Sequence, residues 1–546
     1  MSQAAHRATH RSVAWRHVKA LGAATTVCLG VATAVVGTVT QSWAGATLQY
    51  IVQGSSSRAA AAEVRTAHGD VLSSLPLVHG VVAKLTGEEA AAARQAGLQV
   101  SPNLQLKVDS ISLAPNQDPS SNFGEVTGAS TLLSEGYNGQ GVTVAVLDTG
   151  IDAKLPDFRG RVVGGVNLSG TSAGWNSDQY GHGTFVAGII ASNGAASNGQ
   201  FTGIAPGADL VSIKVAGASG VTSESTVIEG VTWAIDNEST YGIQVLNISL
   251  GVEPSEPSAF DPLDQAVEQA WQSGIVVVTS AGNAGPDNGS ITSPGDDPVV
   301  LTVGALNDGG LGDAATAADY TIPSFSSTGP TLYDGWFKPD LVAPGRSIIS
   351  VMAPGSTIYD ENPTARIGLD NFVGSGTSFS AAMVSGLVAL LLEAEPGLTP
   401  DQVKAALLFS ASPGPIGDPF VDGHGIADVA SAVSVAGQVS LNQSPVEEAE
   451  SAEVAAGAGS TTTPAAVSLS ATWAESTWNP ANWSGAAWNA SPPDTDQGAT
   501  TTGTGTGLTW NGAAWNGAAW NGAAWNGAAW NGAAWNGAAW NDQGWS

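Results

Sequence analysis

A serine at the start of a long apolar run has the sequence setting of a nucleophile. Ser378 follows Gly-Ser-Gly-Thr and leads into the run 384–392, which is apolar on nearly every side and predicts a buried helix. The first turn of a helix carries unpaired N–H groups and partial positive charge, which would stabilise an oxyanion beside this hydroxyl. The ordinary alternative is a serine that caps a core helix.

Three further polar residues occupy comparable positions earlier in the chain. Asp148 ends the apolar stretch 142–147 and precedes Thr-Gly, and His182 stands between two glycines at the head of a small-residue helix. Asn283 follows another apolar stretch and also has glycines on both sides. Each alone could be a turn residue. Together, a carboxylate, an imidazole, an amide and a hydroxyl predict nucleophilic catalysis with an oxyanion donor.

The elements that must position these side chains follow an alternating pattern. Apolar strands and helical runs succeed one another through this region, which predicts an α/β domain with a mainly parallel sheet. In such a sheet the functional side chains gather at the carboxyl ends of the strands. The expected strands are 142–147, 210–215, 245–250, 275–279 and 299–303, and the expected helices are 223–237 and 264–272.

The motifs around these residues resemble the subtilisin family of serine proteases. The resemblance covers about 124–437 and implies a subtilisin-like three-layer fold. It is carried by the segments Val146–Gly150, Gly181–Thr184, Leu246–Gly251, Ala281–Asn283, Phe325–Pro330, Val342–Gly345 and Gly376–Ser378.

The resemblance implies a role for each residue of the candidate site. Ser378 would attack the scissile carbonyl while His182 takes its proton, and Asp148 would orient the imidazole. Asn283 would hold the oxyanion together with the backbone N–H of Ser378. A peptide substrate would lie as an added strand between two edges, which are formed by Ser249, Leu250 and Gly251 on one side and by Gly217 to Val221 on the other.

Several positions depart from the usual family pattern. Phe185, Ala382 and Met383 replace other residue types near the proposed triad. Glu224 lies where the outer substrate pocket is rimmed, which predicts tolerance of basic or polar residues there. Thr292 matches a glycine at the base of the primary pocket, which predicts a shallower pocket.

The chemistry implied by the resemblance requires no cofactor. Asp157 matches the carboxylate of a structural calcium site, and the loop 192–199 offers carbonyl and amide oxygens but no second carboxylate. Oxygen ligands suit calcium, so we expect a structural calcium ion at Asp157. An ordinary surface loop is the alternative.

The charge balance and the amino-terminal segment indicate an exported protein. The chain carries 47 acidic and 17 basic residues, which argues against nucleic-acid binding and against docking on anionic lipid. Residues 1–44 have the layout of a signal peptide, with a basic start, an uncharged middle and a small-residue end. An uncleaved membrane anchor is the alternative. Its single cysteine, Cys28, lies in this leader, so we expect no disulfide in the exported protein.

Residues 45–108 predict a small separate domain. The expected order strand, helix, strand, strand, helix, strand is that of a ferredoxin-like module. It could be an independent binding domain. The subtilisin resemblance implies an inhibitory propeptide that assists folding, blocks the cleft and is removed autocatalytically. The polar, turn-rich segment 109–123 is then the processed linker.

The carboxyl-terminal part has a different composition. Residues 438–470 are rich in small and polar residues and predict a flexible linker. In 471–546 tryptophan recurs every fifth residue, mostly in Trp-Asn-Gly-Ala-Ala units. Exposed indoles favour contact with another surface, so we expect attachment to a cell-wall polymer or self-association, and retention at the cell surface. The alternative is a disordered tail.

The sequence thus predicts a secreted serine endopeptidase made as a self-processed zymogen, with peptides as substrates and its own propeptide as inhibitor. A competing hypothesis is a non-enzymatic surface or assembly protein with a degenerate protease scaffold. A third is a narrow processing protease that the tail localises. None of the four site residues is lost, which favours an enzyme.

Overall fold

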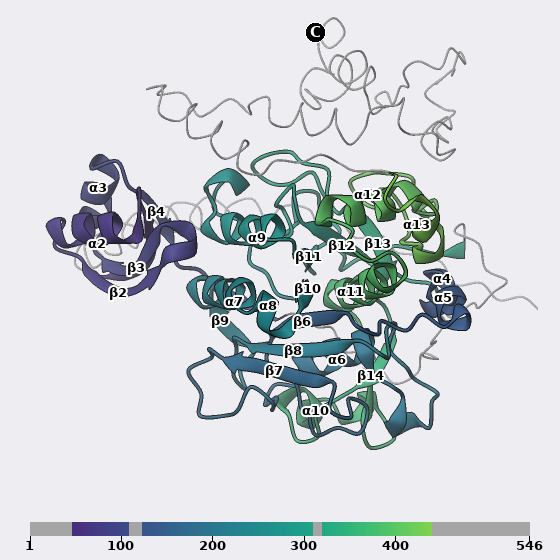
Figure 1. Ribbon diagram of the computed structural model, residues 1–546. Helices are drawn as coiled ribbons and strands as arrows, with labels where there is room; N and C mark the ends of the chain where they lie inside the picture. Colours follow the sequence, from purple (N-terminus) through teal and green to yellow (C-terminus); the bar gives the residue numbers. More distant parts are fainter. Residues whose placement is uncertain (1–45, 109–122, 310–318, 439–546) are drawn as a thin grey trace, which may run out of the picture. The chain divides into compact units, whose positions relative to one another are not determined.

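The computed structural model describes residues 46–108, 123–309 and 319–438 (Figure 1). The predicted leader, most of the predicted linker 109–123 and the tryptophan-rich tail lie outside these ranges. The described chain forms two compact units, and each is taken by itself below. The smaller unit ends at Val100, so the segment from Ser101 onward belongs to the larger unit, before the predicted boundary at 108.

The smaller unit is a four-stranded sheet with two helices. The strand order is β2-β3-β1-β4, and β1 pairs antiparallel with β3. Capping fixes where the helices begin, since Ser56 caps the first and Thr86 with Glu89 forms a capping box on the second. The elements are β1 (Leu48–Gln53), α2 (Ser57–Thr66), β2 (Asp70–Leu75), β3 (Gly80–Leu85), α3 (Gly87–Gln95) and β4 (Gln99–Pro102).

A seven-stranded sheet forms the centre of the larger unit. Its order is β13-β12-β11-β10-β6-β8-β7, and all neighbouring strands are parallel. This confirms the predicted α/β class with a mainly parallel sheet. The strands are β6 (Thr143–Asp148), β7 (Val162–Asn167), β8 (Asp209–Lys214), β10 (Ile243–Ile248), β11 (Val276–Ser280), β12 (Leu301–Leu306) and β13 (Leu341–Pro344).

The strand order reverses beside β6. The chain first adds β8 and β7 on one side of β6 and then adds β10 to β13 on the other. Loops that leave neighbouring strands in opposite directions open a crevice at the carboxyl end of a parallel sheet. Asp148 is the last residue of β6 and therefore lies at this crevice.

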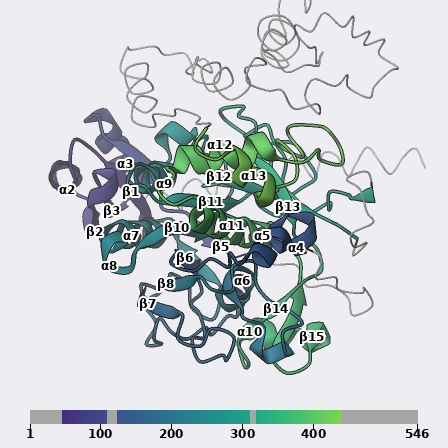
Figure 2. The ribbon, with the colours of Figure 1, turned by 45° about the vertical axis from the view of Figure 1, so that its right-hand side comes forward.

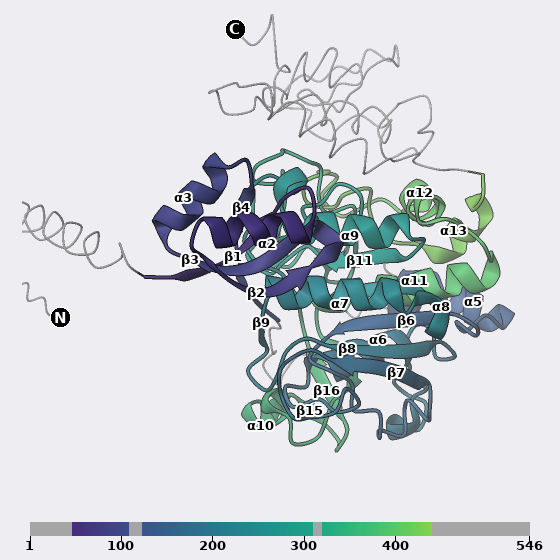
Figure 3. The ribbon, with the colours of Figure 1, turned by 60° about the vertical axis from the view of Figure 1, so that its left-hand side comes forward.

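Two pairs of helices pack on the sheet. One pair is α6 (His182–Ala191) with α11 (Thr377–Ala394), and Figure 2 shows α6 beside β14 (Ile348–Val351). The other is α7 (Glu224–Asp236) with α9 (Pro262–Gln272), which run side by side in Figure 3. Although α11 is long and apolar enough to cross a membrane, it is a core helix, since Thr377 to Leu392 are all buried.

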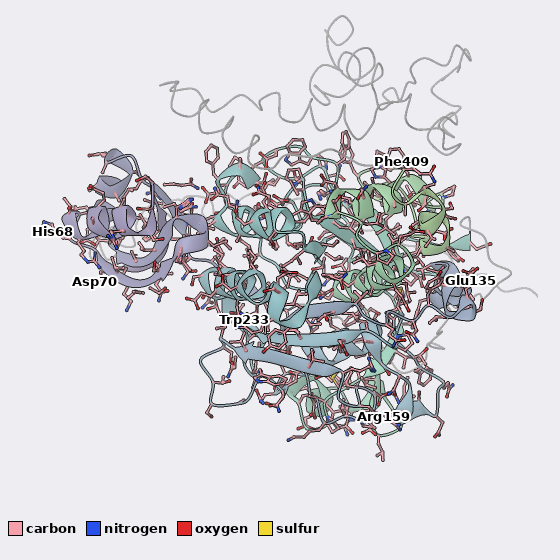
Figure 4. All side chains as sticks on the ribbon, in the orientation of Figure 1. His68, Asp70, Glu135, Arg159, Trp233 and Phe409 are labelled. Atoms are coloured by element: carbon pink, nitrogen blue, oxygen red, sulfur yellow. The ribbon has the colours of Figure 1, made fainter. Side chains whose placement is uncertain are left out.

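Shorter elements complete the larger unit. Figure 4 shows Trp233 on α7, where its ring lies 5.7 Å from that of Tyr241. The remaining helices are α4 (Phe123–Val126), α5 (Ala129–Glu135), α8 (Glu238–Tyr241), α10 (Thr357–Glu361), α12 (Pro400–Ser410) and α13 (Val429–Val435). The remaining strands are β5 (Gln105–Lys107), β9 (Val221–Ser223), β15 (Arg366–Ile367) and β16 (Asn371–Gly374), and the short 3-10 turns are Pro76–Val78, Ala195–Ser197, Ser258–Phe260 and Pro363–Ala365.

Candidate active site

Asp148 and His182 form a buried pair at the crevice. The Nδ1 atom of His182 lies 3.0 Å from Oδ1 and 2.9 Å from Oδ2 of Asp148, and neither side chain is exposed. His182 is the first residue of α6 and follows Gly181, whose φ of 108° favours glycine. The other ring nitrogen, Nε2, is buried and makes no hydrogen bond within the described residues. The carboxylate thus orients the imidazole and leaves Nε2 without a hydrogen-bond partner among the described residues.

Ser378 is the second residue of α11, the helix that packs against α6. Its Oγ lies 3.3 Å from the carbonyl oxygen of Ser249, and the Ser249 hydroxyl donates to the Ser378 carbonyl at 3.0 Å. These contacts fix the start of α11 against the segment that follows β10. The structure therefore brings the predicted nucleophile to the same crevice as the acid–base pair, at the amino-terminal end of a buried helix.

Asn283 lies in the loop that follows β11. Its Oδ1 accepts hydrogen bonds from the backbone N–H of Thr377 at 2.9 Å and from the Thr377 hydroxyl at 3.1 Å. Since the two ends of an amide diverge, the NH₂ group points away from Thr377. The residue bonded to Asn283 is the one immediately before Ser378, so the amide lies beside the predicted nucleophile.

A segment of the chain itself lies along the predicted substrate edges. β5 pairs antiparallel with β9, and Lys107 also forms an antiparallel bridge with Gly251. Val108 donates its N–H to the Gly220 carbonyl at 3.1 Å. The predicted edge Ser249 to Gly251 thus pairs with this segment through Gly251. On the other side the ladder covers Gly220 to Ser223, which includes Val221 but begins beyond Gly217.

Comparison with known proteins places these features in a family. The Subtilase family (Peptidase_S8) matches residues 139–491, more than half of the chain. Subtilisin DY of Bacillus licheniformis is 35% identical over 307 residues, which span 56% of this chain and 95% of that protein. The chain belongs to the subtilase family. It is a subtilisin-type serine protease by family.

Two further similarities agree with this assignment. Serine protease AprX of Bacillus subtilis (strain 168) is 42% identical over 300 residues, 54% of this chain and 66% of AprX. The crystal structure of fervidolysin from Fervidobacterium pennivorans, a keratinolytic enzyme related to subtilisin, matches with a TM-score of 0.57 and 25% identity. That match covers 71% of this chain and 61% of fervidolysin, so the chain spans about two thirds of each protein's length.

The position of the subtilase histidine depends on a carboxylate that the sequence analysis missed. Asp178 is buried and accepts hydrogen bonds from the backbone N–H groups of Gly181 and Thr184 at 2.8 and 2.9 Å, and from the Thr149 hydroxyl at 2.9 Å. Burial raises the pKa of Asp178, although these backbone hydrogen bonds oppose the rise. Asp178 thus ties the start of α6 to the residue after Asp148. Its place four residues before His182 is the only sequence signal for it.

Phe185, one of the unusual residues near the proposed triad, packs against Phe379. The rings of Phe185 and Phe379 lie 4.5 Å apart, and the Phe379 ring lies 5.6 Å from the His182 ring. Both phenylalanines are buried. Phe185, an expected departure from the family pattern, therefore packs against a second aromatic side chain beside the His182 imidazole.

Asp157, the predicted calcium ligand, already accepts hydrogen bonds from the chain. It is fully buried, and its oxygens accept from the Ser192 hydroxyl at 2.8 Å and from the Ala196 N–H at 3.3 and 3.2 Å. No group of three acidic, histidine or cysteine side chains suited to a metal ion occurs among the described residues. These hydrogen bonds support a role for Asp157 as an anchor of the loop 192–199, and the calcium ion at Asp157 stays a prediction.

Proposed function

We propose that this protein is a secreted serine endopeptidase that is made as a self-processed zymogen. The observation that carries the proposal is the Asp148–His182 pair at the crevice that also holds Ser378. For this chemistry the Ser378 hydroxyl would have to leave the Ser249 carbonyl and donate to Nε2 of His182. His182 would then take the proton as the hydroxyl attacks a peptide carbonyl, and return it to the leaving amine.

Asn283 and the backbone N–H of Ser378 would stabilise the oxyanion. The Asn283 oxygen is held by Thr377, which supports the NH₂ end as the donor. Losing the amide donor costs a subtilisin about 10²–10³ in turnover. We therefore expect Asn283→Ala to lose activity by that factor while its fold remains intact.

Labelling tests the enzyme assignment directly. The purified, processed protein is incubated with casein and with a serine-directed fluorophosphonate. We expect casein hydrolysis and a covalent adduct on Ser378, both absent in Ser378→Ala. A processed protein that neither cleaves casein nor reacts at Ser378 would favour the non-enzymatic assembly protein.

The zymogen proposal rests on the segment from Ser101 to Val108. Because β5 takes the place of a substrate strand between β9 and Gly251, it would exclude other peptides until it is removed. Residues 45–108, with their ferredoxin-like element order, would be the inhibitory propeptide. We expect Ser378→Ala to accumulate as the unprocessed chain, and its conversion to the processed length in a protease-free host would contradict self-processing.

Thr292 supports the expectation of a shallow primary pocket. Its Oγ1 lies 3.4 Å from the Ala281 carbonyl, and its side chain lies between two glycines. A methyl group added to Gly251 or to Gly282 would lie 2.5 or 2.9 Å from this Oγ1. A β-branched side chain has few alternative rotamers, so it would limit the pocket to small side chains. Peptides with alanine before the scissile bond should be cleaved faster than those with phenylalanine, and Thr292→Gly should reverse the order.

Export and the tail belong to the same proposal. The leader 1–44 would direct secretion, and the tryptophan repeats of 471–546 would bind a cell-wall polymer or associate with another copy. Deletion of 471–546 tests this, because the truncated enzyme should keep its activity and be lost from washed cell walls and from self-associated species. Unchanged distribution would leave the tail as a disordered extension.

A further inference from the structure

The amino-terminal end of α7 contacts the segment that precedes β5. Glu224, the first residue of α7, donates its N–H to the Leu104 carbonyl at 2.9 Å, and its carboxylate accepts the Leu104 N–H at 3.2 Å. The next residue, Ser225, donates its N–H to the side-chain oxygen of Asn103 at 3.0 Å. Helix α7 therefore binds Leu104 through both of its main-chain groups and Asn103 through its side-chain oxygen.

These contacts complete the cap of the helix. The first N–H groups of a helix lack partners within it. In α7 the third of them, on Thr226, is satisfied by the hydroxyl of the cap residue Ser223 at 3.3 Å. The first two, on Glu224 and Ser225, are satisfied by Leu104 and Asn103, which lie about 120 residues away in the sequence. Chain 103–104 thus occupies a place that another extended peptide could take.

The register of β5 shows which residues of a bound peptide, counted back from the scissile bond, would contact the start of α7. Lys107 lies opposite Gly251, and the Ser249 carbonyl is 3.3 Å from the Ser378 hydroxyl. In a substrate strand that pairs antiparallel in this register, the position two residues after the one at Gly251 would lie opposite Ser249. A scissile bond after that position puts Lys107 at the third residue before it. Counting back, Leu104 takes the sixth position and Asn103 the seventh.

We propose that the first turn of α7, with the Glu224 carboxyl group, is a distal substrate subsite that binds the main chain of the sixth residue before the scissile bond and a side-chain oxygen on the seventh. This inference rests on the proposed function. It extends the recognised peptide well beyond the three-residue ladder of β5. Here Glu224 contacts a main-chain N–H, and its predicted place at the rim of an outer pocket that tolerates basic or polar residues stays a prediction.

The charge around Glu224 gives the subsite a pH dependence. Glu224 is only 2% exposed beneath the bound segment, and the charged groups that face it are Asp261, at the cap of α9, and Glu256, both acidic. Burial first, and then the negative charge of Asp261, raise the pKa of Glu224 well above its ordinary value. Burial by the segment favours the protonated form and outweighs the hydrogen bond from the Leu104 N–H, which lowers the pKa of Glu224. Occupation of the subsite therefore takes up a proton and weakens as the pH rises.

Peptide length and composition test the subsite on the processed wild-type enzyme. Peptides that carry seven residues before the scissile bond are compared with peptides that carry four, as the ratio of their kcat/KM values. We expect the longer peptide to be favoured at least about tenfold, with a further loss of about threefold to tenfold when the seventh residue is changed from asparagine to alanine. Equal values for both lengths would overturn the subsite, although cleavage of the short peptide would still support the proposed function.

Two substitutions of Glu224, with Glu229→Gln as the control, test the role of Glu224. Glu224→Ala should lower the long-to-short ratio by about threefold to tenfold, whereas Glu229→Gln, on the same helix, should keep the wild-type ratio. Glu224→Gln retains an acceptor for the main-chain N–H, so the ratio should persist but lose its decline between acidic and alkaline pH. A wild-type ratio that does not change with pH, or one that Glu224→Ala leaves intact, would remove Glu224 from the subsite.

Discussion

At the scale of single residues, the site depends on carboxylates with different tasks. Asp148 contacts the imidazole, whereas Asp178 holds the backbone from which the imidazole projects. Glu224 contacts neither and instead accepts the main-chain N–H of Leu104, the residue before β5. Burial and hydrogen bonding, more than residue type, determine what each carboxylate does.

Replacement of Asp178 should loosen the start of α6. An asparagine at 178 retains one acceptor oxygen and cannot satisfy all the donors that Asp178 now accepts. We expect Asp178→Asn to lower the free energy of unfolding by about 1–3 kcal/mol and to slow the labelling of Ser378. Chemical denaturation and the rate of fluorophosphonate reaction measure these effects. Asp152→Asn, at a half-buried position nearby, should stay within about 0.5 kcal/mol of wild type; an equal loss in both variants would contradict a specific role of Asp178.

At the scale of elements, two buried lysines join α12 to the central sheet. Lys404 donates to the carbonyls of Pro298, Val299 and Val300 at 2.9, 3.0 and 3.0 Å, and lies 3.2 Å from Asp340. Lys338 lies 2.7 Å from the other oxygen of Asp340. Two ammonium groups thus share one carboxylate, and three consecutive carbonyls point at one of them. This cluster fixes α12 and the loop before β12 to the strand β13.

Removal of the Lys404 ammonium should destabilise the larger unit. Lys404→Met preserves the length of the side chain but removes the lysine donor from the Pro298 and Val299 carbonyls, whereas Val300 still accepts from Lys338. We expect a loss of about 3 kcal/mol in the free energy of unfolding at pH 7, since buried carbonyls lose a hydrogen-bond donor that the amine supplies in either protonation state. Lys154→Met, at an exposed position, serves as the control. Unchanged unfolding of Lys404→Met would show that the cluster contributes nothing net.

The same lysine predicts part of the pH dependence of stability. Burial lowers the pKa of Lys404 to about 7, whereas the unfolded chain keeps a value near 10.5. Between these values the unfolded state binds more protons, so this group makes stability rise with pH from about 7 to about 10.5. We expect Lys404→Met to lose that contribution, measured as the difference in unfolding free energy between pH 7 and pH 10. Parallel curves for both proteins would contradict it.

At the scale of the whole molecule, the acidic composition continues into the interior of the larger unit. Asp261, Asp264, Asp296 and Asp297 are all buried, and burial, followed for Asp264 and Asp296 by the negative charge of neighbouring carboxylates, raises their pKa values. At pH values above the ordinary carboxyl pKa, the folded state therefore binds more protons than the unfolded state. Stability from these groups is therefore lost as the pH rises through their folded pKa values.

One substitution isolates this effect. Asp264→Asn removes a charge that is buried among other carboxylates and keeps the shape of the side chain. We expect it to raise the melting temperature at pH 8 and to change it less at pH 4, where the carboxyl group is protonated in the folded state and about half protonated in the unfolded chain. A stabilisation that is the same at both values would mean that packing, rather than charge, is responsible.

The calcium prediction has its own test. Asp157 uses its oxygens to accept hydrogen bonds from the loop 192–199, so we expect a chelator to leave the melting temperature unchanged. Ser192→Ala, which removes one of these donors, should lower it. A clear drop on chelation that added calcium reverses would restore the calcium site that the sequence predicted.

The sequence by itself determined the family, the α/β class and the four residues of the candidate site, because glycine-flanked Asp148, His182, Asn283 and Ser378 sit in short contiguous motifs. Only the tertiary structure decided which residues support them. These supporting contacts join segments that are distant in the sequence, or they depend on burial. They are made by Asp178, by the pair Lys338 and Lys404, and by α7 with Asn103 and Leu104. Single acids and lysines have no spacing that marks them in advance. Their roles follow from the low dielectric and the donors that the folded chain places around them.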